Sequence, residues 1–280
     1  MADAKSEVNC VLRSLNYPGF EELIKELEAK GVKTRVVVDS EYLSNQRIYL
    51  PYVKFVDLGR GMMHSNYCVV DESTVIVGSL ILNENTIVTN IHDFLIINSS
   101  TLAQAYSSDF WKIYQEQPRF EQNVSLFNLI DDKYSVVFCP YDGCEHALLE
   151  VIDSANESIH FAIYSFTNPA MKDALVRAQL RGVEIKGLLE KEGVTDKFSL
   201  FYSNVLGVNI DYCKKRIHTK VWVIDGKYVL TGSFNPSVNA VEYNYENILF
   251  IDDLILAKFY DSFISDLYSS CSYILDDVIK

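Results

Sequence analysis

The chain has 280 residues, which is enough for one large domain or two ordinary ones. A composition of 49% hydrophobic and 22% charged residues is that of a globular protein with a full core, and it excludes a disordered chain. With 25 Lys and Arg against 38 Asp and Glu, the net charge of -13 excludes a broad basic surface, so that any polyanion must bind at a local patch.

The first part of the chain predicts a strand at residues 8–15, a helix at 19–30 that stops at Gly31, and a second strand at 32–38. A helix at 101–115 follows. Strand, helix and strand with short joints imply a right-handed parallel unit, and hence an α/β sheet with helices packed on it.

The second part predicts the same order after a lead-in. Its expected strands lie at 136–139, 159–166 and 183–189, and its expected helices at 145–155, 170–181 and 254–269. Between the two parts, residues 116–133 carry Pro118 and little periodicity, and we interpret them as a connector.

A hairpin with polar ends stands out in the second part. His218 and Lys220 lie two residues apart at the head of an apolar run, so that in a strand they would share a face. Asp225-Gly226 then separates two β-rich runs, which is a strong hairpin signal. The second run ends in Gly232-Ser233-Phe234-Asn235, and Lys214-Lys215-Arg216 precedes the first run as the best basic patch of the chain.

The two parts are copies of one another. A shift of 154 residues places His64 on His218, Asp71 on Asp225, Ser79 on Ser233, His92 on Glu246 and Asp93 on Asn247. Upstream the shift is 151, with Ser14 on Ser165 and Pro18 on Pro169. So small a drift predicts two copies of one fold. The expected organisation is a first repeat at 1–115, which looks short at its N-terminus, the connector at 116–133, and a second repeat at 134–280.

The second copy reads HxKxxxxDGxxxxxGSxN followed by NxEN, and it resembles the signature of the phospholipase D superfamily. The first copy is similar but departs from it, because Asn66 replaces the lysine, Ile81 the last asparagine, and His92-Asp93 the Glu-Asn pair. The resemblance covers essentially the whole chain. It implies two tandem α/β repeats about a pseudo-twofold axis, with a mixed sheet and one active site between them.

The resemblance also implies roles. One histidine would attack phosphorus and form a phosphohistidine while the other protonates the leaving oxygen, with no metal and no cofactor. By this resemblance His64 is the nucleophile and His218 the acid. Each histidine would be oriented by a carboxylate of the opposite copy. His64 would pair with Glu246, and His218 with Asp93, or with His92 if the register slips by one.

The residues support phosphodiester chemistry on their own terms. The reaction needs a nucleophile, an acid and positive charge on the non-bridging oxygens, and the two histidines with Lys220 can supply these. Asn66 donates hydrogen bonds without charge, so the missing lysine is expected to cost about 2–4 kcal/mol of transition-state stabilisation if nothing compensates.

Other motif residues have more modest expected roles. We expect Asp71 and Asp225 to be structural, each bonding its own backbone at a hairpin bend. We expect Ser79, Ser233, Asn235, Asn66 and His92 to contact substrate phosphate, although the serines and Asn235 could be turn residues only. The histidines and cysteines show no zinc-ligand spacing, so no metal site is expected.

The cysteines and the hydropathy bear on the compartment. No apolar run approaches the length of a membrane span and no signal peptide is visible, which predicts a soluble protein. None of the six cysteines is in a CxxC pair and three lie in apolar runs, which predicts reduced core thiols and favours the cytoplasm. They are Cys10, Cys68, Cys139, Cys144, Cys213 and Cys271.

Three functions remain open on the sequence. The first is a metal-independent nuclease or nucleic-acid phosphodiesterase, which the compact copies and the GSFN ending favour. The second is a phospholipase D acting on lipid head groups, and the third a degenerate, non-catalytic binding module, suggested by Asn66, Ile81 and His92. Because one chain holds both motifs, no oligomer is required.

Overall fold

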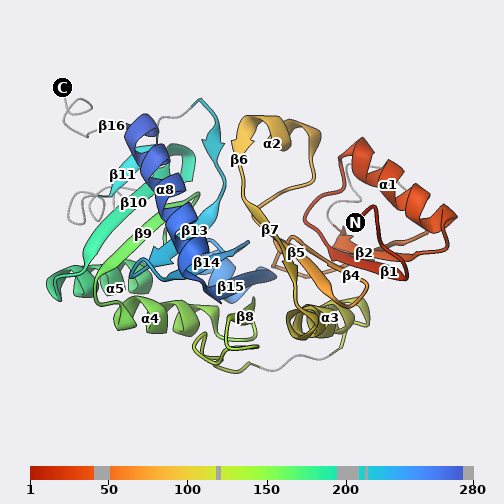
Figure 1. Cartoon of the computed structure of the whole chain (residues 1–280), viewed down its shortest axis with the longest axis horizontal. Coiled ribbons are helices and arrows are strands. Elements are labelled where there is room, and N and C mark those ends of the chain that lie inside the picture. The colour runs from red at the N-terminus through yellow and green to blue at the C-terminus, as the bar shows by residue number, and fades with distance from the viewer. Residues whose placement is uncertain (41–50, 118–120, 194–207, 212–213, 274–280) are drawn as a thin grey trace.

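The computed structural model describes residues 1–40, 51–117, 121–193, 208–211 and 214–273. Figure 1 shows two α/β halves side by side, each built on its own sheet, as the fold prediction requires. The first sheet has six strands and is assembled from the first repeat, and the second has eight strands from the second repeat.

The first sheet has the strand order β3-β2-β1-β4-β5-β7. Strands β1, β2 and β3 are parallel, and β4, β5 and β7 continue the sheet in antiparallel pairs. Its strands are β1 (Glu7–Val11), β2 (Lys33–Asp39), β3 (Val53–Val56), β4 (Tyr67–Val70), β5 (Thr74–Gly78) and β7 (Phe94–Asn98).

The second sheet repeats this order and extends it, as β16-β11-β10-β9-β13-β14-β15-β8. Its strands are β8 (Tyr134–Cys139), β9 (Ser158–Ile163), β10 (Glu184–Glu190), β11 (Asn209–Asp211), β13 (Lys220–Ile224), β14 (Tyr228–Gly232), β15 (Glu246–Asp252) and β16 (Ser272–Tyr273). The predicted hairpin is therefore confirmed as β13 and β14, which pair in antiparallel fashion.

Helices cover both faces of the two sheets. Helices α3 and α8 pack into one apolar cluster that spans both halves, with Phe110 of α3 and Ile264 of α8 fully buried in it. Helix α1 covers the other face of the first sheet, and α4 and α5 the other face of the second. The helices are α1 (Pro18–Ala29), α2 (Glu84–Thr89), α3 (Ser100–Tyr114), α4 (Cys144–Ser154), α5 (Pro169–Leu180), α7 (Val238–Glu242) and α8 (Leu254–Cys271), with a 3-10 turn at Lys191–Gly193.

The halves differ in the lead-in that the sequence predicts for the second repeat only, which the structure shows as strand β8 and helix α4. Strand β8 pairs with β15 and forms the edge of the sheet, and Ile248 and Phe250 of β15 are buried in the apolar cluster that also contains residues of α4. On the equivalent strand β7, Phe94 and Ile96 are 51% and 63% exposed. Equivalent apolar positions are thus buried on β15 and exposed to solvent on β7.

Two short backbone bridges join the halves at the motif histidines. Strand β12 (Arg216–Ile217) pairs with β6 (Asn90–Ile91), and the backbone N–H of His218 donates to the Ile91 carbonyl at 2.9 Å. In the related bridge the N–H of His64 donates to the Tyr245 carbonyl at 3.0 Å. Each histidine is therefore held by the strand end of the opposite half.

The prediction of reduced thiols is wrong for the five cysteines that the structure describes, since all five are disulfide-bonded, Cys271 among them. Cys10 and Cys68 are directly opposite on β1 and β4 and form a disulfide, and Cys139 forms a second with Cys144. Cross-strand Cβ atoms lie close enough to be bridged, a proximity that spacing along the chain does not reveal. Cys213 lies outside the described residues.

Within the described ranges, none of the helices combines the length and the apolar character that crossing a bilayer requires.

Candidate functional site

The two motif histidines face one another across the junction of the halves. Their ring centroids are 6.2 Å apart and both residues are buried, at 7% and 8% exposure. His64 lies between β3 and β4, and His218 lies between β12 and β13, just before the strand in which we expected it. The two histidines that the family resemblance places in one site therefore lie together within one chain.

His64 is held by a carboxylate of the opposite half, as expected. Its Nδ1 lies 2.7 Å from Oε2 of Glu246 and 3.1 Å from the Ser233 carbonyl oxygen. Two acceptors at one ring nitrogen assign the proton to Nδ1, which leaves the lone pair on Nε2. Burial lowers the pKa of His64, and the Glu246 carboxylate opposes that shift.

His218 has a different environment. Its Nδ1 lies 3.3 Å from the Ser79 carbonyl oxygen, and its ring centroid is 4.9 Å from that of His92. Burial, together with the positive charge of Lys220, lowers the pKa of His218 well below its usual value, and the nearby His64 and His92 act in the same direction.

The prediction that His218 pairs with Asp93 is wrong. The backbone N–H of Asp93 donates to Oγ of Ser79, as that of Asn247 donates to Oγ of Ser233, so these positions correspond and the register does not slip. His92 therefore occupies the place of Glu246. His218 thus has the His92 ring as its neighbour, at the position where His64 has the Glu246 carboxylate.

Asp93 instead joins the two halves through hydroxyl groups. Its carboxylate accepts hydrogen bonds from Ser79 at 2.7 Å, from Thr219 at 2.6 Å and from Tyr260 at 3.2 Å, and also from Thr231. Burial and the Asp93 carboxylate raise the pKa of the Tyr260 phenol, which keeps it a donor. The carboxylate that we assigned to catalysis has its contacts in the core.

Lys220 reaches His218 directly. Its Nζ lies 3.0 Å from Nδ1 and 3.3 Å from Nε2 of the ring, and it donates to the His218 carbonyl at 2.6 Å. Burial lowers the pKa of Lys220 to about 7, although Glu246 and Asp93 oppose the shift. Lys220 is thus a cation whose charge depends on pH near neutrality.

The serines and Asn235 of the motif do not line the cavity between the halves, contrary to expectation. Oγ of Ser79 donates to Asp93, and Oγ of Ser233 accepts from the N–H of Asn247 at 3.0 Å. All three residues are buried, and the two serine hydroxyls form hydrogen bonds at the strand ends, whereas Oδ1 of Asn235 has no hydrogen-bond partner among the described residues. It is the backbone carbonyls of Ser79 and Ser233 that hold the histidine rings.

Asp71 and Asp225 have structural contacts, but with different partners from those expected. Asp71 accepts from the backbone N–H groups of residues 5–7 and from the hydroxyl of Ser6. Asp225 accepts from the N–H groups of residues 156–158. Each aspartate caps the start of the neighbouring strand instead of closing its own turn.

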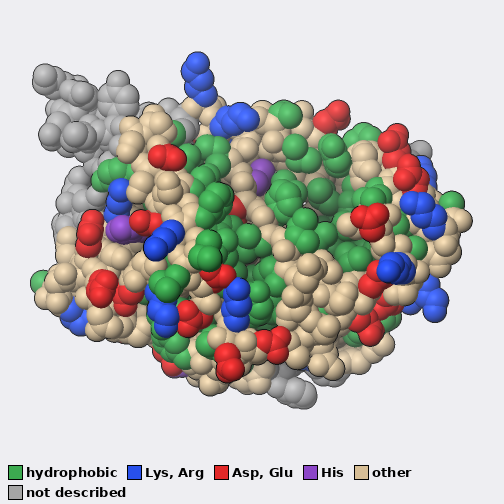
Figure 2. Space-filling view, viewed as in Figure 1, with side chains coloured by type: hydrophobic (Ala, Val, Ile, Leu, Met, Phe, Trp, Pro, Cys, Tyr) green, Lys and Arg blue, Asp and Glu red, His purple; other side chains and the backbone are tan. Residues whose placement is uncertain are grey.

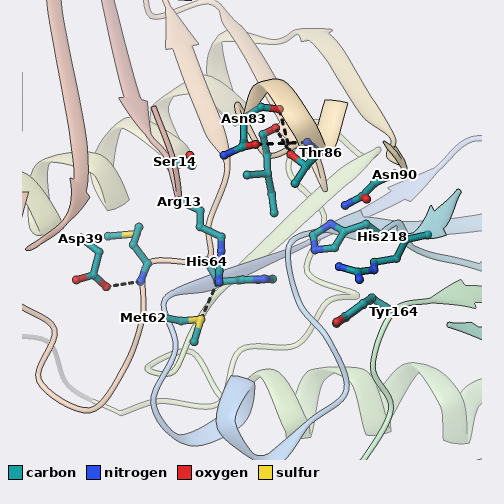
Figure 3. A pocket seen from close by; sticks show the side chains of 13 residues that line it. Arg13, Ser14, Asp39, Met62, His64, Asn83, Thr86, Asn90, Tyr164 and His218 are labelled. Carbon is teal, nitrogen blue, oxygen red and sulfur yellow. Dashed lines mark hydrogen bonds between the residues drawn. The ribbon is translucent and has the colours of Figure 1, made fainter. Parts of the chain in front are cut away.

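A cavity of about 530 Å³ opens onto both histidines (Figure 3). Of its lining residues, His64 and His218 were predicted as site residues, and Ile81 and Arg216 had been named as a departure from the motif and as part of the basic patch. The others are Arg13, Ser14, Asp39, Met62, Met63, Asn83, Thr86, Asn90 and Tyr164. The repeat offset of 151 was the signal available for two of them, because it aligns Arg13 with Tyr164 as it aligns Ser14 with Ser165.

A pair of carboxylates was also missed. Asp39 at the end of β2 accepts from the N–H of Met63 at 3.0 Å, and Glu190 at the end of β10 accepts from the N–H of Ile217 at 2.7 Å. Both are buried, and the offset of 151 aligns them. Each fixes the residue immediately before a motif histidine.

Comparison with known proteins agrees with this geometry. The family model described as cardiolipin synthase, PLD-like domain, matches residues 1–114 and 148–267. A phospholipase D of Rickettsia prowazekii is 37% identical over 139 residues, which are 49% of this chain and 68% of that protein. A mitochondrial cardiolipin hydrolase of Xenopus tropicalis is 30% identical over 128 residues, 44% of this chain and 61% of that protein.

The fold also matches over nearly the whole chain. The crystal structure of a phosphatidylserine synthase from Haemophilus influenzae superposes with a TM-score of 0.75, covering 98% of this chain and 83% of that one at 12% identity. The two motif histidines at one junction, the two repeats and the family match agree, and the chain belongs to the phospholipase D superfamily.

Proposed function

We propose that the protein is a metal-independent phosphodiester hydrolase that acts through a covalent phosphohistidine. The observation that carries the proposal is the pair of buried histidines, His64 and His218, 6.2 Å apart, with Glu246 behind one and Lys220 beside the other. A phosphoryl group that bridges the two rings would be attacked on one side and lose its alkoxide on the other.

His64 is the nucleophile in this proposal. The proton on Nδ1 leaves Nε2 free to attack phosphorus, and Glu246 stabilises the positive charge that develops on the ring. As the N–P bond forms, the bond from phosphorus to the leaving oxygen breaks. Water then attacks the phosphohistidine, which releases the phosphate monoester and restores His64.

His218 is the acid and then the base. It gives its proton to the leaving alkoxide in the first step and takes a proton from the attacking water in the second, so protons balance over one turnover. The Lys220 ammonium, 3.0 Å from the ring, stabilises charge on the non-bridging oxygens.

For the substrate we propose a nucleic acid strand. The cavity at the histidines and a neighbouring cavity of about 350 Å³ share Thr86, Asn90 and Arg216 in their linings, and Lys214 also lines the second. The second lining also holds Lys191 and the carboxylates Glu190 and Glu192, and Arg216 pairs with Glu192. A polar trough with basic side chains along it suits a repeating sugar-phosphate backbone, and it is the local patch that a chain with a net charge of -13 needs.

A phospholipid is the second candidate. The relatives named phospholipase D and cardiolipin hydrolase favour it. Hydrophobic side chains also gather over the middle of the face shown in Figure 2, and Phe94, Ile96 and Phe259 are among the exposed apolar residues of the chain.

The mechanism is tested by acid quench with bis-p-nitrophenyl phosphate in excess EDTA. We expect turnover to persist and a phosphoenzyme to be trapped. Because p-nitrophenolate leaves without protonation, His218→Ala should keep the burst of product, whereas His64→Ala should show none. A burst that survives only in His64→Ala would reverse the roles, and no covalent species in any variant would leave the non-catalytic module as the alternative.

The substrate class is tested in parallel with single-stranded DNA, RNA and phosphatidylcholine vesicles. We expect the nucleic acids to be cleaved with the higher kcat/KM, and Arg216→Ala to weaken that cleavage more at low salt than at high salt, because the variant makes one phosphate contact fewer and so depends less on salt. Preferential hydrolysis of the vesicles would assign the site to lipids.

A further inference from the structure

The site has lost one of the cations that its chemistry calls for, and the structure offers a replacement. Phosphoryl transfer gathers negative charge on the non-bridging oxygens, and positive groups that are already in place stabilise it. The second repeat supplies Lys220, whereas the first repeat has Asn66 at the same motif position.

The side-chain amide of Asn66 is hydrogen-bonded to the backbone on both sides. Its Nδ2 donates to the His64 carbonyl at 2.9 Å, and its Oδ1 accepts from the backbone N–H of Arg13 at 3.2 Å. The residue is only 6% exposed and does not line the cavity. Its amide therefore brings no charge to the phosphate, and instead it fixes the backbone from which Arg13 projects.

We propose that Arg13 is the second phosphate-binding cation of the site and takes the place of the missing lysine, an inference that rests on the phosphodiesterase function proposed above. Arg13 lies two residues beyond the end of β1 and lines the same cavity as His64 and His218. In Figure 3 its side chain runs from the strand end toward His64, where Nη1 contacts Sδ of Met62 at 2.7 Å.

The positive charge of Arg13 affects the pKa values of His64 and Lys220. It is among the causes that lower the pKa of His64 and the pKa of Lys220, after burial in both cases. A cation near both groups is placed to act on an anion that lies between them.

The internal repeat supports the exchange independently. The position of Arg13 corresponds to Tyr164, whose ring centroid lies 5.7 Å from Nζ of Lys220. The first half therefore has arginine with asparagine, and the second has tyrosine with lysine. Each half thus has a cation near its side of the site, but on different elements: Arg13 lines the cavity, whereas Lys220 is 2% exposed and lies against the His218 ring.

The exchange has a chemical consequence. A guanidinium stays charged at every working pH and can hold two phosphate oxygens at once, whereas the charge of Lys220, with a pKa lowered to about 7, depends on pH. Arg13 would thus secure binding of the phosphate diester above the pH at which Lys220 becomes neutral.

The test compares Arg13→Ala, Arg13→Tyr, Asn66→Lys and the double variant Arg13→Tyr/Asn66→Lys, which copies the pair of the second half. Two quantities are measured: the burst rate with bis-p-nitrophenyl phosphate, and the Kd of inorganic phosphate by calorimetry, which needs no turnover. Arg177→Ala is the matched control, because Arg177 is exposed on α5 and pairs with Asp153 outside the cavity.

We expect Arg13→Ala and Arg13→Tyr to lower the burst rate about 10²-fold and to weaken phosphate binding, with the control unchanged. Asn66→Lys alone should also lower the rate, because it removes the bond to Arg13 N and sets two cations side by side. The double variant should recover at least about tenfold over Arg13→Tyr, since the lysine then replaces the guanidinium.

Unchanged rate and unchanged phosphate affinity in Arg13→Ala would overturn the inference while leaving the phosphodiesterase standing. A wild-type protein that forms no phosphoenzyme but loses phosphate affinity with Arg13→Ala would overturn the proposed hydrolase and keep Arg13 as the anion ligand. Failure of the double variant to recover, when it unfolds in urea like the wild type, would also count against the exchange.

Discussion

His92 distinguishes the environments of the two catalytic histidines more than any other residue. It stands at the position of Glu246, so that His64 has a carboxylate at 2.7 Å and His218 has an imidazole ring at 4.9 Å. A carboxylate would favour the protonated ring, whereas burial and Lys220 favour the neutral one. The proposed acid is therefore the harder of the two to protonate.

Activity with a substrate that needs the acid should accordingly fall as pH rises. The lowered pKa of His218 means that its protonated form is lost at a lower pH than usual, and Lys220 loses its charge near pH 7. We expect His92→Glu to raise the pKa of His218 and move the falling limb of kcat upward by about one pH unit. The measurement is the pH profile of kcat with an alkyl phosphodiester.

His92→Gln is the matched control, because it has the shape of glutamate without the charge. It should move the falling limb by much less than His92→Glu. Equal profiles for the wild type and His92→Glu would contradict the role given to this position.

At the scale of elements, each hairpin is tied to the strand beside it by one carboxylate. The turn residues Asp71 and Glu72 have positive φ angles of 51° and 52°, which are left-handed values that aspartate tolerates better than most residues. From there Asp71 caps the start of β1, as Asp225 caps the start of β9. The motif aspartate thereby fixes the sheet that carries the histidine.

Removing this cap should lower stability without touching the site. We expect Asp71→Ala to reduce the free energy of unfolding by ~2 kcal/mol, since several backbone donors lose a charged acceptor. Although burial opposes it, the Ser6 hydroxyl and the backbone N–H groups lower the pKa of Asp71 to about 2. Because the pKa of Asp71 is lower in the folded than in the unfolded protein, the ionised carboxylate stabilises the fold at any pH above its unfolded-state pKa. This contribution is lost as pH falls from about 4 to about 2.

Urea unfolding at pH 7 and at pH 2.5 measures the effect, with Glu72→Asn as the control in the same turn. We expect the control to be neutral and the deficit of Asp71→Ala to shrink at the lower pH. A constant deficit at both pH values would mean that the charge of Asp71 is not what stabilises the strand.

At the scale of the whole molecule, function depends on how closely the halves approach. Gly61, in the first half, is buried against the backbone of the second, and a Cβ there would run into the Tyr243 carbonyl oxygen. The same loop leads into His64, whose N–H donates to the Tyr245 carbonyl. The distance between the histidines is therefore set by backbone contact between the halves.

Gly61→Ala should push the halves apart and reduce turnover more than stability. We expect a loss of about 1–3 kcal/mol in unfolding free energy from overpacking. The fall in kcat should exceed 10-fold, because a shift of about 1 Å in the histidines is costly. Gly59→Asn in the same loop is the control, since Gly59 has a φ of 64° and open space around it. Equal kcat in the wild type and Gly61→Ala would show that the loop can relax.

Much of the fold could be predicted from local patterns. The repeat offset, the glycine stop at Gly31 and the Asp225-Gly226 turn predicted the strands and helices with boundaries close to those observed, because periodicity and turn chemistry act over a few residues. The resemblance of the two motif copies to the phospholipase D superfamily, and not the local patterns, placed His64, His218 and Glu246 in one site.

Only the tertiary structure decided the contacts between segments that lie far apart in the chain. A disulfide between Cys10 and Cys68, the engagement of Asp93 by hydroxyl groups, and the arrival of Arg13 at the cavity all depend on which strands are neighbours and which side chains point into the junction. Sequence spacing has no access to these distances, because packing across a sheet and between two halves sets them. The sequence by itself determined the motif and its two copies, and the packing of the halves determined which side chains surround each histidine.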